Sequence, residues 1–80
     1  MTSIQILRIV DFSQKIGTFP DLVVTEASHP SSEVLLKIFD ITTQASCHIR
    51  IYPSGRFRVN GESFFDSNDA LIAVLKNLKE

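Results

Sequence analysis

Two runs of alternating polar and apolar residues carry the side chains best suited to binding chemistry. The polar positions on either side of Pro53-Ser54-Gly55 are His48, Arg50, Tyr52, Arg56, Arg58 and Asn60. The apolar positions between them are Cys47, Ile49, Ile51, Phe57 and Val59. Because side chains alternate between the two faces of a strand, this pattern predicts a β-hairpin with the polar set on one face. Such a face is suited to binding phosphate or carboxylate groups.

The turn decides which residues of this hairpin lie opposite each other. A three-residue loop at Pro53-Ser54-Gly55, with its glycine in the left-handed conformation, places Tyr52 opposite Arg56. The same loop places Arg50 opposite Arg58. A two-residue loop would put an isoleucine opposite Arg58 and mix the two faces, so we expect the longer loop.

Two interpretations of the polar face remain open. Arg50 and Arg58 repel each other in this register unless an anion lies between them, which favours an anion-binding or nucleic-acid-binding face. Alternatively, the face is solvated, and carboxylates such as Glu33 and Glu62 partner its charges.

The sequence predicts neither catalysis nor a cofactor. His29 and His48 are the only histidines, and Cys47 is the only cysteine, which alternation directs toward the core. No spacing of His, Cys and carboxylate residues resembles a metal site. The three glycines are scattered and form no phosphate-binding loop. We therefore expect a protein that is not an enzyme, with no metal and no cofactor.

Length and composition bound the remaining possibilities. Eighty residues with 44% hydrophobic and 21% charged content predict one globular domain over residues 1–80. A formal net charge of −1 gives no overall attraction to nucleic acid, so any basic function must be local. A single cysteine, no recognisable leader and no apolar run of membrane-spanning length favour an intracellular protein, cytoplasmic or nuclear, with no membrane partner.

The elements that position the polar face form an α+β domain. We expect strands at residues 4–11, 21–27 and 33–40, followed by the hairpin at 46–65. A helix capped by Asp66 should run over residues 67–78 and pack an apolar stripe on the sheet. The members of that stripe are Leu71, Val74, Leu75 and Leu78. The predicted fold is an antiparallel β-meander of four to five strands with one C-terminal helix packed on one face.

Part of this pattern is similar to a known family. Residues 51–61 (IYPSGRFRVNG), followed by a helix, resemble the strand–turn–strand of one repeat of the TATA-box-binding protein core. Residues 19–22 (FPDL) resemble the Phe-Pro-x-Leu that enters an earlier strand of that repeat, and Ile9-Val10 resemble part of its first strand.

The resemblance implies roles for four residues. Aromatic side chains of that family wedge between base steps in the minor groove, which points to Phe19 and Tyr52. A basic residue after the Ser-Gly turn contacts the phosphate backbone, which points to Arg56. The residue before the following glycine contacts base edges, which points to Asn60.

Two functional hypotheses follow. The first is a nucleic-acid-binding, transcription-related module that uses its basic and aromatic sheet face. The second is a protein-interaction or regulatory module, for instance of phage type, that binds an acidic partner or pairs through an edge strand. In both cases we expect a homo-oligomer, most simply a dimer, because association covers exposed strand edges.

Overall fold

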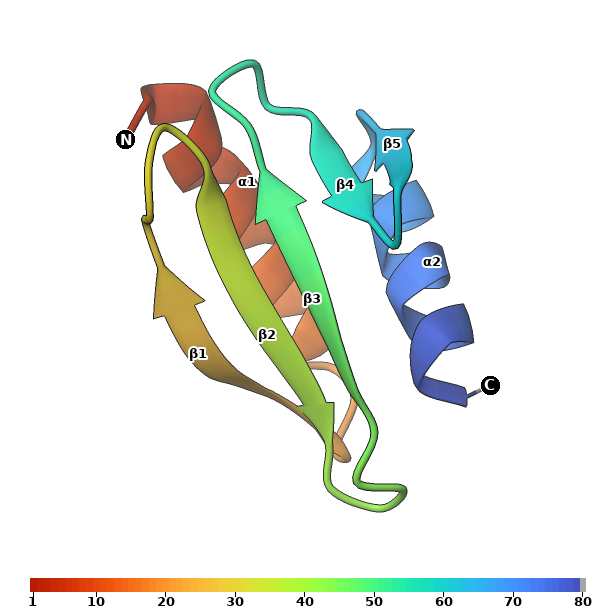
Figure 1. Ribbon diagram of the computed structural model, residues 1–80. Helices are drawn as coiled ribbons and strands as arrows, with labels where there is room; N and C mark the ends of the chain where they lie inside the picture. Colours follow the sequence, from red (N-terminus) through yellow and green to blue (C-terminus); the bar gives the residue numbers. More distant parts are fainter. Residues whose placement is uncertain (80) are drawn as a thin grey trace.

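The computed structural model, which describes residues 1–79, is a five-stranded antiparallel sheet with one helix at each end of the chain (Figure 1). Each strand pairs with the next one along the sequence, so the sheet is a meander. The elements are α1 (Ser3–Ile16), β1 (Leu22–Ser28), β2 (Val34–Asp40), β3 (Ser46–Ile51), β4 (Phe57–Val59), β5 (Glu62–Phe64) and α2 (Ser67–Lys79). The predicted α+β meander with a C-terminal helix is confirmed.

The strand predicted at residues 4–11 is wrong, because this segment belongs to α1. The Thr2 hydroxyl accepts a hydrogen bond from the Gln5 backbone N–H at 3.2 Å, and the Gln5 side-chain oxygen accepts one from the Thr2 N–H at 2.9 Å. This capping box starts a helix. Phe12 and Ile16, four residues apart, are buried on the face toward the sheet. Packing of this helical stripe outweighs the β-branched composition of residues 4–11.

The first strand is therefore β1, and Ile9 and Val10 lie on a helix rather than on a strand. The sheet nevertheless has five strands, because β5 pairs with β4 across a two-residue turn at Asn60-Gly61. Both turn residues have positive φ, 50° and 83°, as the tight turn of such a hairpin requires.

The inward face of the sheet is apolar, whereas the open face is mixed, because Leu35 and Phe39 of β2 lie there beside Lys37 and the polar residues of β3. The inward side chains of β2, β3 and β4 form the core with α1 and α2, and they are Val34, Leu36, Ile38, Cys47, Ile49, Ile51, Phe57 and Val59. Figure 1 looks onto the other face, with both helices behind the sheet. No element of the described chain covers that face, so the alternating polar residues are left open.

The buried stripe of α2 differs from the predicted one by a small rotation. Val74 and Leu78 are buried as expected, but Leu71 and Leu75 are only half-buried. Ala70 is buried instead, at 0% exposure. The reason is that α2 packs against α1 as well as against β3 and β4. Its most buried side chains therefore point between the sheet and the neighbouring helix. Within residues 1–79, no helix combines the length and the apolar character needed to cross a membrane.

Candidate binding surface on the open sheet face

The hairpin of β3 and β4 has the predicted register. Arg50 lies opposite Arg58, with Ile51 opposite Phe57 on the inward face. The Tyr52 N–H donates to the Arg56 carbonyl at 2.9 Å and closes the three-residue loop. All six polar hairpin residues predicted from the alternation thus belong to one hairpin.

The open face carries a basic patch, which we define as Lys37, His48, Arg50 and Arg58. Lys37 of β2 lies opposite His48 of β3, and Arg50 of β3 lies opposite Arg58 of β4. Directly opposite side chains in an antiparallel sheet have Cβ atoms about 5 Å apart. The four side chains therefore occupy two adjacent rows of the sheet and can contact one extended ligand together.

Two carboxylates reduce the positive charge of the basic patch. Glu33 forms an ion pair with Arg50, and Glu26 of β1 lies opposite Lys37. The solvated-face interpretation predicted a partner at Glu33, and that contact is present. Arg58 forms no ion pair with any residue in the range 1–79, and its neighbour on β5 is Ser63. Arg58 is therefore the arginine of the hairpin most available to an external anion.

A polar hollow of about 360 Å³ lies beside the basic patch. It opens where β4 ends, since β3 continues over Ser46–His48 beyond its last β4 pair, Ile49 with Val59. Its lining residues are Ser46, Cys47, His48, Arg50, Arg58, Asn60, Gly61 and Asn77. The hollow combines cationic and amide donors, the groups that bind phosphate oxygens.

Tyr52 and Arg56 form a stacked pair at the end of the hairpin. The Arg56 guanidinium carbon is 4.5 Å from the centre of the Tyr52 ring, which is a cation–π contact. Both side chains are half-buried, and the Arg56 Nε is buried with no hydrogen-bond partner in residues 1–79. One face of the Tyr52 ring is therefore already occupied, so only its other face and edge remain for a ligand.

The hairpin turn that carries this pair is held by α1. Gly55 has φ of 90°, and a Cβ built on it would lie 2.8 Å from the Ile4 side chain. The Thr2 hydroxyl donates to the Pro53 carbonyl at 3.2 Å. The fully buried Gln5 amide donates to the Ile51 carbonyl at 2.9 Å. Close packing of glycine and two helix-to-turn hydrogen bonds together fix the position of the turn.

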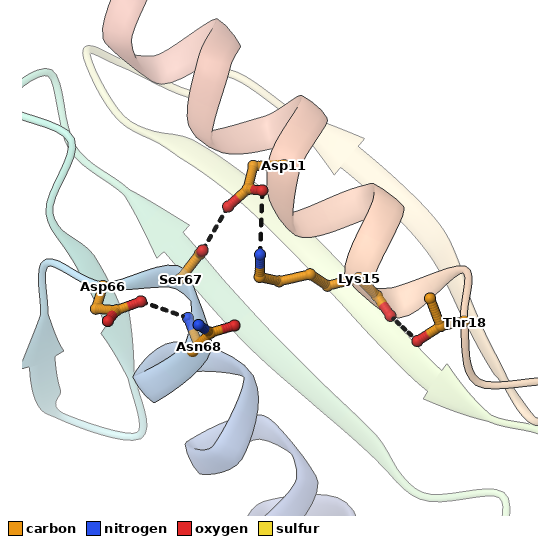
Figure 2. A network of polar contacts seen from close by, with 6 residues as sticks. All are labelled: Asp11, Lys15, Thr18, Asp66, Ser67 and Asn68. Carbon is orange, nitrogen blue, oxygen red and sulfur yellow. Dashed lines mark hydrogen bonds and ion pairs between the residues drawn. The ribbon is translucent and has the colours of Figure 1, made fainter.

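A second polar network joins the two helices behind the sheet (Figure 2). The Asp11 carboxylate accepts hydrogen bonds from the Ser67 hydroxyl and from Lys15 Nζ, the latter at 3.1 Å. These hydrogen bonds, that of Ser67 first, hold the pKa of Asp11 below its ordinary range. The Asp66 carboxylate accepts from the Asn68 N–H at 2.8 Å at the start of α2. This network is structural: it fixes the helix pair that supports the sheet.

Phe19, one of the predicted site residues, lies apart from the basic patch. Phe19 lies in the loop between α1 and β1 and packs against the core near Leu22 and Leu75. That loop is at the Asp40 end of β2, whereas Tyr52 follows Ile51, which pairs at the Val34 end. Six residues of strand separate the two ends by about 20 Å. Phe19 and Tyr52 therefore do not form one aromatic pair on the open face.

Asn60 lines the hollow, but its backbone already has a structural role. With φ of 50°, it occupies the first position of the Asn60-Gly61 turn between β4 and β5. Asparagine tolerates this conformation better than most residues, so the turn alone explains its identity. Its amide is an additional donor at the rim of the hollow.

The alternating sequence of β2 could have identified one more residue of the basic patch, Lys37. Lys37 stands between Leu36 and Ile38, and its place on the polar face follows once β2 is paired with β3. Asn77, at the far wall of the hollow, comes from α2, and no sequence pattern links it to the hairpin.

The described residues 1–79 contain no group of three or more His, Cys, Asp or Glu side chains that could hold a metal ion. Cys47 is free and buried, and its burial raises the pKa of the thiol. A thiol in this setting is poorly suited to act as a nucleophile.

Comparison with known proteins found no matching family model, no matching curated protein and no matching solved structure. The resemblance of residues 51–61 to the TATA-box-binding protein core thus stays a prediction.

Proposed function

We propose that this protein is a small, non-catalytic module that binds nucleic acid through the open face of its sheet. The observation that carries the proposal is the direct opposition of Arg50 and Arg58 beside a polar hollow, with only Arg50 neutralised by a carboxylate. Like charges held side by side destabilise a sheet unless an anion joins them. A phosphate group in the hollow would contact Arg58, His48 and the amide groups at its rim.

The aromatic side chain at the end of the hairpin supports the same function. Tyr52 directly follows β3 and is two residues from Arg50 of the basic patch, and its ring is in contact with Arg56. Bases stack on aromatic rings of open sheets, and such stacking contributes about 1–3 kcal/mol per base. The module would then bind a strand by its backbone at the basic patch and by a base at Tyr52.

A homodimer, which the sequence predicts, would strengthen this function. The basic patch offers two arginines, a lysine and a histidine within a nearly neutral chain, so single-copy affinity is expected to be low. Two linked faces raise the overall affinity without any new contact. The proposed setting is a reducing compartment, cytoplasmic or nuclear, in keeping with the single cysteine.

The salt dependence of binding tests this function. Fluorescence anisotropy with labelled duplex and single-stranded oligonucleotides should show that the logarithm of affinity falls with the logarithm of salt concentration, with a slope near −0.9 per phosphate contact on duplex. Arg58→Gln should flatten the slope by about one unit. Lys76→Gln, which removes an exposed charge on α2, serves as the matched control and should leave the slope unchanged. Tyr52→Ala should lower affinity with little change in slope.

A protein partner is the second candidate, and the carboxylates near the basic patch favour it. Glu26 and Glu33 lie among the basic residues, so the open face has mixed charge of the kind that pairs with a complementary protein surface. If the wild-type protein binds neither duplex nor single-stranded nucleic acid at low salt, the nucleic-acid function is refuted and an acidic protein partner becomes the better explanation.

A further inference from the structure

The open face carries an aromatic side chain that the core does not use. Phe39 of β2 projects from this face, opposite Val23 of β1 and Ser46 of β3. It is half-buried, but it is not among the partly buried apolar residues that pack against the core. Within residues 1–79 its ring forms no pair with another aromatic ring. Because no element of the described chain covers this face, the outer side of the ring is available to a ligand.

Phe39 and Tyr52 lie at the two ends of the basic patch. Phe39 is two residues from Lys37 along β2, and Tyr52 is two residues from Arg50, just beyond the end of β3. Phe39 pairs with Ser46, and six residues of strand lead from there to Tyr52, a rise of about 20 Å. The order along the open face is therefore one aromatic ring, two rows of basic side chains and a second aromatic ring.

We propose, as an extension that rests on the proposed function, that the ligand of the open face is single-stranded nucleic acid. One base stacks on Phe39, another stacks on the free face of Tyr52, and the phosphates between them contact the basic patch. In a duplex, neighbouring base pairs cover both faces of an internal base, so the base reaches an aromatic ring only after the stack is opened. Unpaired bases need no such step, and they stack on aromatic side chains directly.

The modest charge of the open face also favours a single strand. Glu26 lies opposite Lys37, and Glu33 forms an ion pair with Arg50, so the basic patch can neutralise only a few phosphates. A ligand held by few phosphate contacts must take most of its affinity from another interaction. Stacking on two rings is that interaction, and only unpaired bases provide it without opening a duplex.

Tryptophan fluorescence tests the proposed stacking, because the chain contains no tryptophan of its own. A single-stranded oligonucleotide of about ten nucleotides should quench the fluorescence of Phe39→Trp, since the indole would lie against a base. Leu7→Trp is the matched control: Leu7 is 68% exposed on α1, which lies behind the sheet (Figure 1), and a tryptophan there should keep its fluorescence.

Affinities from fluorescence anisotropy give a second measurement. The wild type should bind the duplex of the same sequence at least about tenfold more weakly than the single strand. Phe39→Ala should weaken single-strand binding about tenfold with little change in its salt dependence, and Leu7→Ala should leave it unchanged. Should Phe39→Ala fail to fold, Phe39→Leu keeps an apolar side chain without the ring and should show the same loss. Phe39→Tyr keeps the ring and should retain wild-type affinity.

The outcomes separate the ligand class from the function on which it rests. Equal or tighter binding of the duplex, an unquenched Phe39→Trp that still binds, or wild-type affinity of Phe39→Leu would each overturn the single-strand proposal and leave nucleic-acid binding standing. A wild type that binds neither single-stranded nor duplex nucleic acid at low salt would refute the proposed function as well.

Discussion

Replacement of Gln5 by leucine should be among the most destabilising single changes outside the hydrophobic core. The Gln5 amide nitrogen donates to the Ser32 carbonyl at 2.8 Å and to the Ile51 carbonyl at 2.9 Å, and so joins the loop between β1 and β2 and the end of β3 to α1. Its amide oxygen accepts from the Thr2 N–H at 2.9 Å. Leucine has a similar size and fills the site, but it satisfies none of these three groups.

The size of the destabilisation depends on whether water can reach the backbone groups that lose their hydrogen bonds. Ile51 is fully buried, so water cannot replace the hydrogen bond that its carbonyl loses. The unsatisfied carbonyl costs about 1–3 kcal/mol. Ser32 is exposed, and its carbonyl can be rehydrated at little cost. Loss of the capping box adds about 1 kcal/mol. The sum, about 2–4 kcal/mol, is a large part of the stability of so small a domain and corresponds to a fall in Tm of roughly 10–30 °C.

Urea unfolding followed by circular dichroism measures this change. Gln14→Leu is the matched control, because Gln14 is on the same helix and exposed, and its replacement should change the free energy of unfolding by less than about 0.5 kcal/mol. Equal effects of the two substitutions would show that the buried hydrogen bonds of Gln5 do not stabilise the fold, and the reasoning would be refuted.

Two further predictions concern the turn and the helix pair. Gly55→Ala should destabilise the fold by more than Gly61→Ala in thermal unfolding. Both glycines have positive φ, but only Gly55 has a neighbour within 4 Å of the added Cβ. Equal losses of stability would contradict this packing. The lowered pKa of Asp11 means that its ionised form stabilises the folded state at any pH above the unfolded value of about 4, and that this contribution is lost as pH falls through the lower folded pKa. Ser67→Ala removes the main cause of the lowered pKa. The urea midpoint of this variant should therefore lie below that of the wild type by a constant amount above about pH 5, and by a smaller amount below about pH 4. A difference that does not depend on pH would assign the Ser67 effect to packing alone.

The hairpin was predictable because its information is local. The alternation over residues 47–60 and a glycine at the third loop position determine the faces, the turn and the opposition of Arg50 and Arg58. The helix at residues 67–78 was predictable for the same reason, since it contains an apolar repeat and a capping aspartate, Asp66, directly precedes it. In each case one face is buried, so that a shifted register would expose the core.

Helix α1 was not predicted, because apolar residues lie on its exposed side as well as on its buried side. Ile6, Leu7 and Val10 are on the exposed side. These additional apolar residues obscure the helical spacing of the buried residues, so the composition of the segment is typical of a strand. The Thr2 and Gln5 pair of the capping box was the remaining signal for a helix. Likewise, the contribution of Asn77 to the hollow depends on where α2 lies against β3, which is a tertiary fact with no local sequence signature.

The two sides of α1 serve different surfaces of the molecule. On its inner side, Gln5 holds the end of β3 that leads into the hairpin turn, and so helps to set the positions of Tyr52 and Arg56 at the end of the open face. Its apolar outer side, around Leu7, makes no comparable contact within the chain. Loss of Gln5 should therefore loosen the hairpin turn, whereas substitutions on the outer side of α1 should leave the basic patch in place. Gln5 is thus a polar residue on a core-facing side that otherwise holds Phe12 and Ile16. Its buried amide satisfies the carbonyls of Ser32 and Ile51, which no apolar side chain could satisfy.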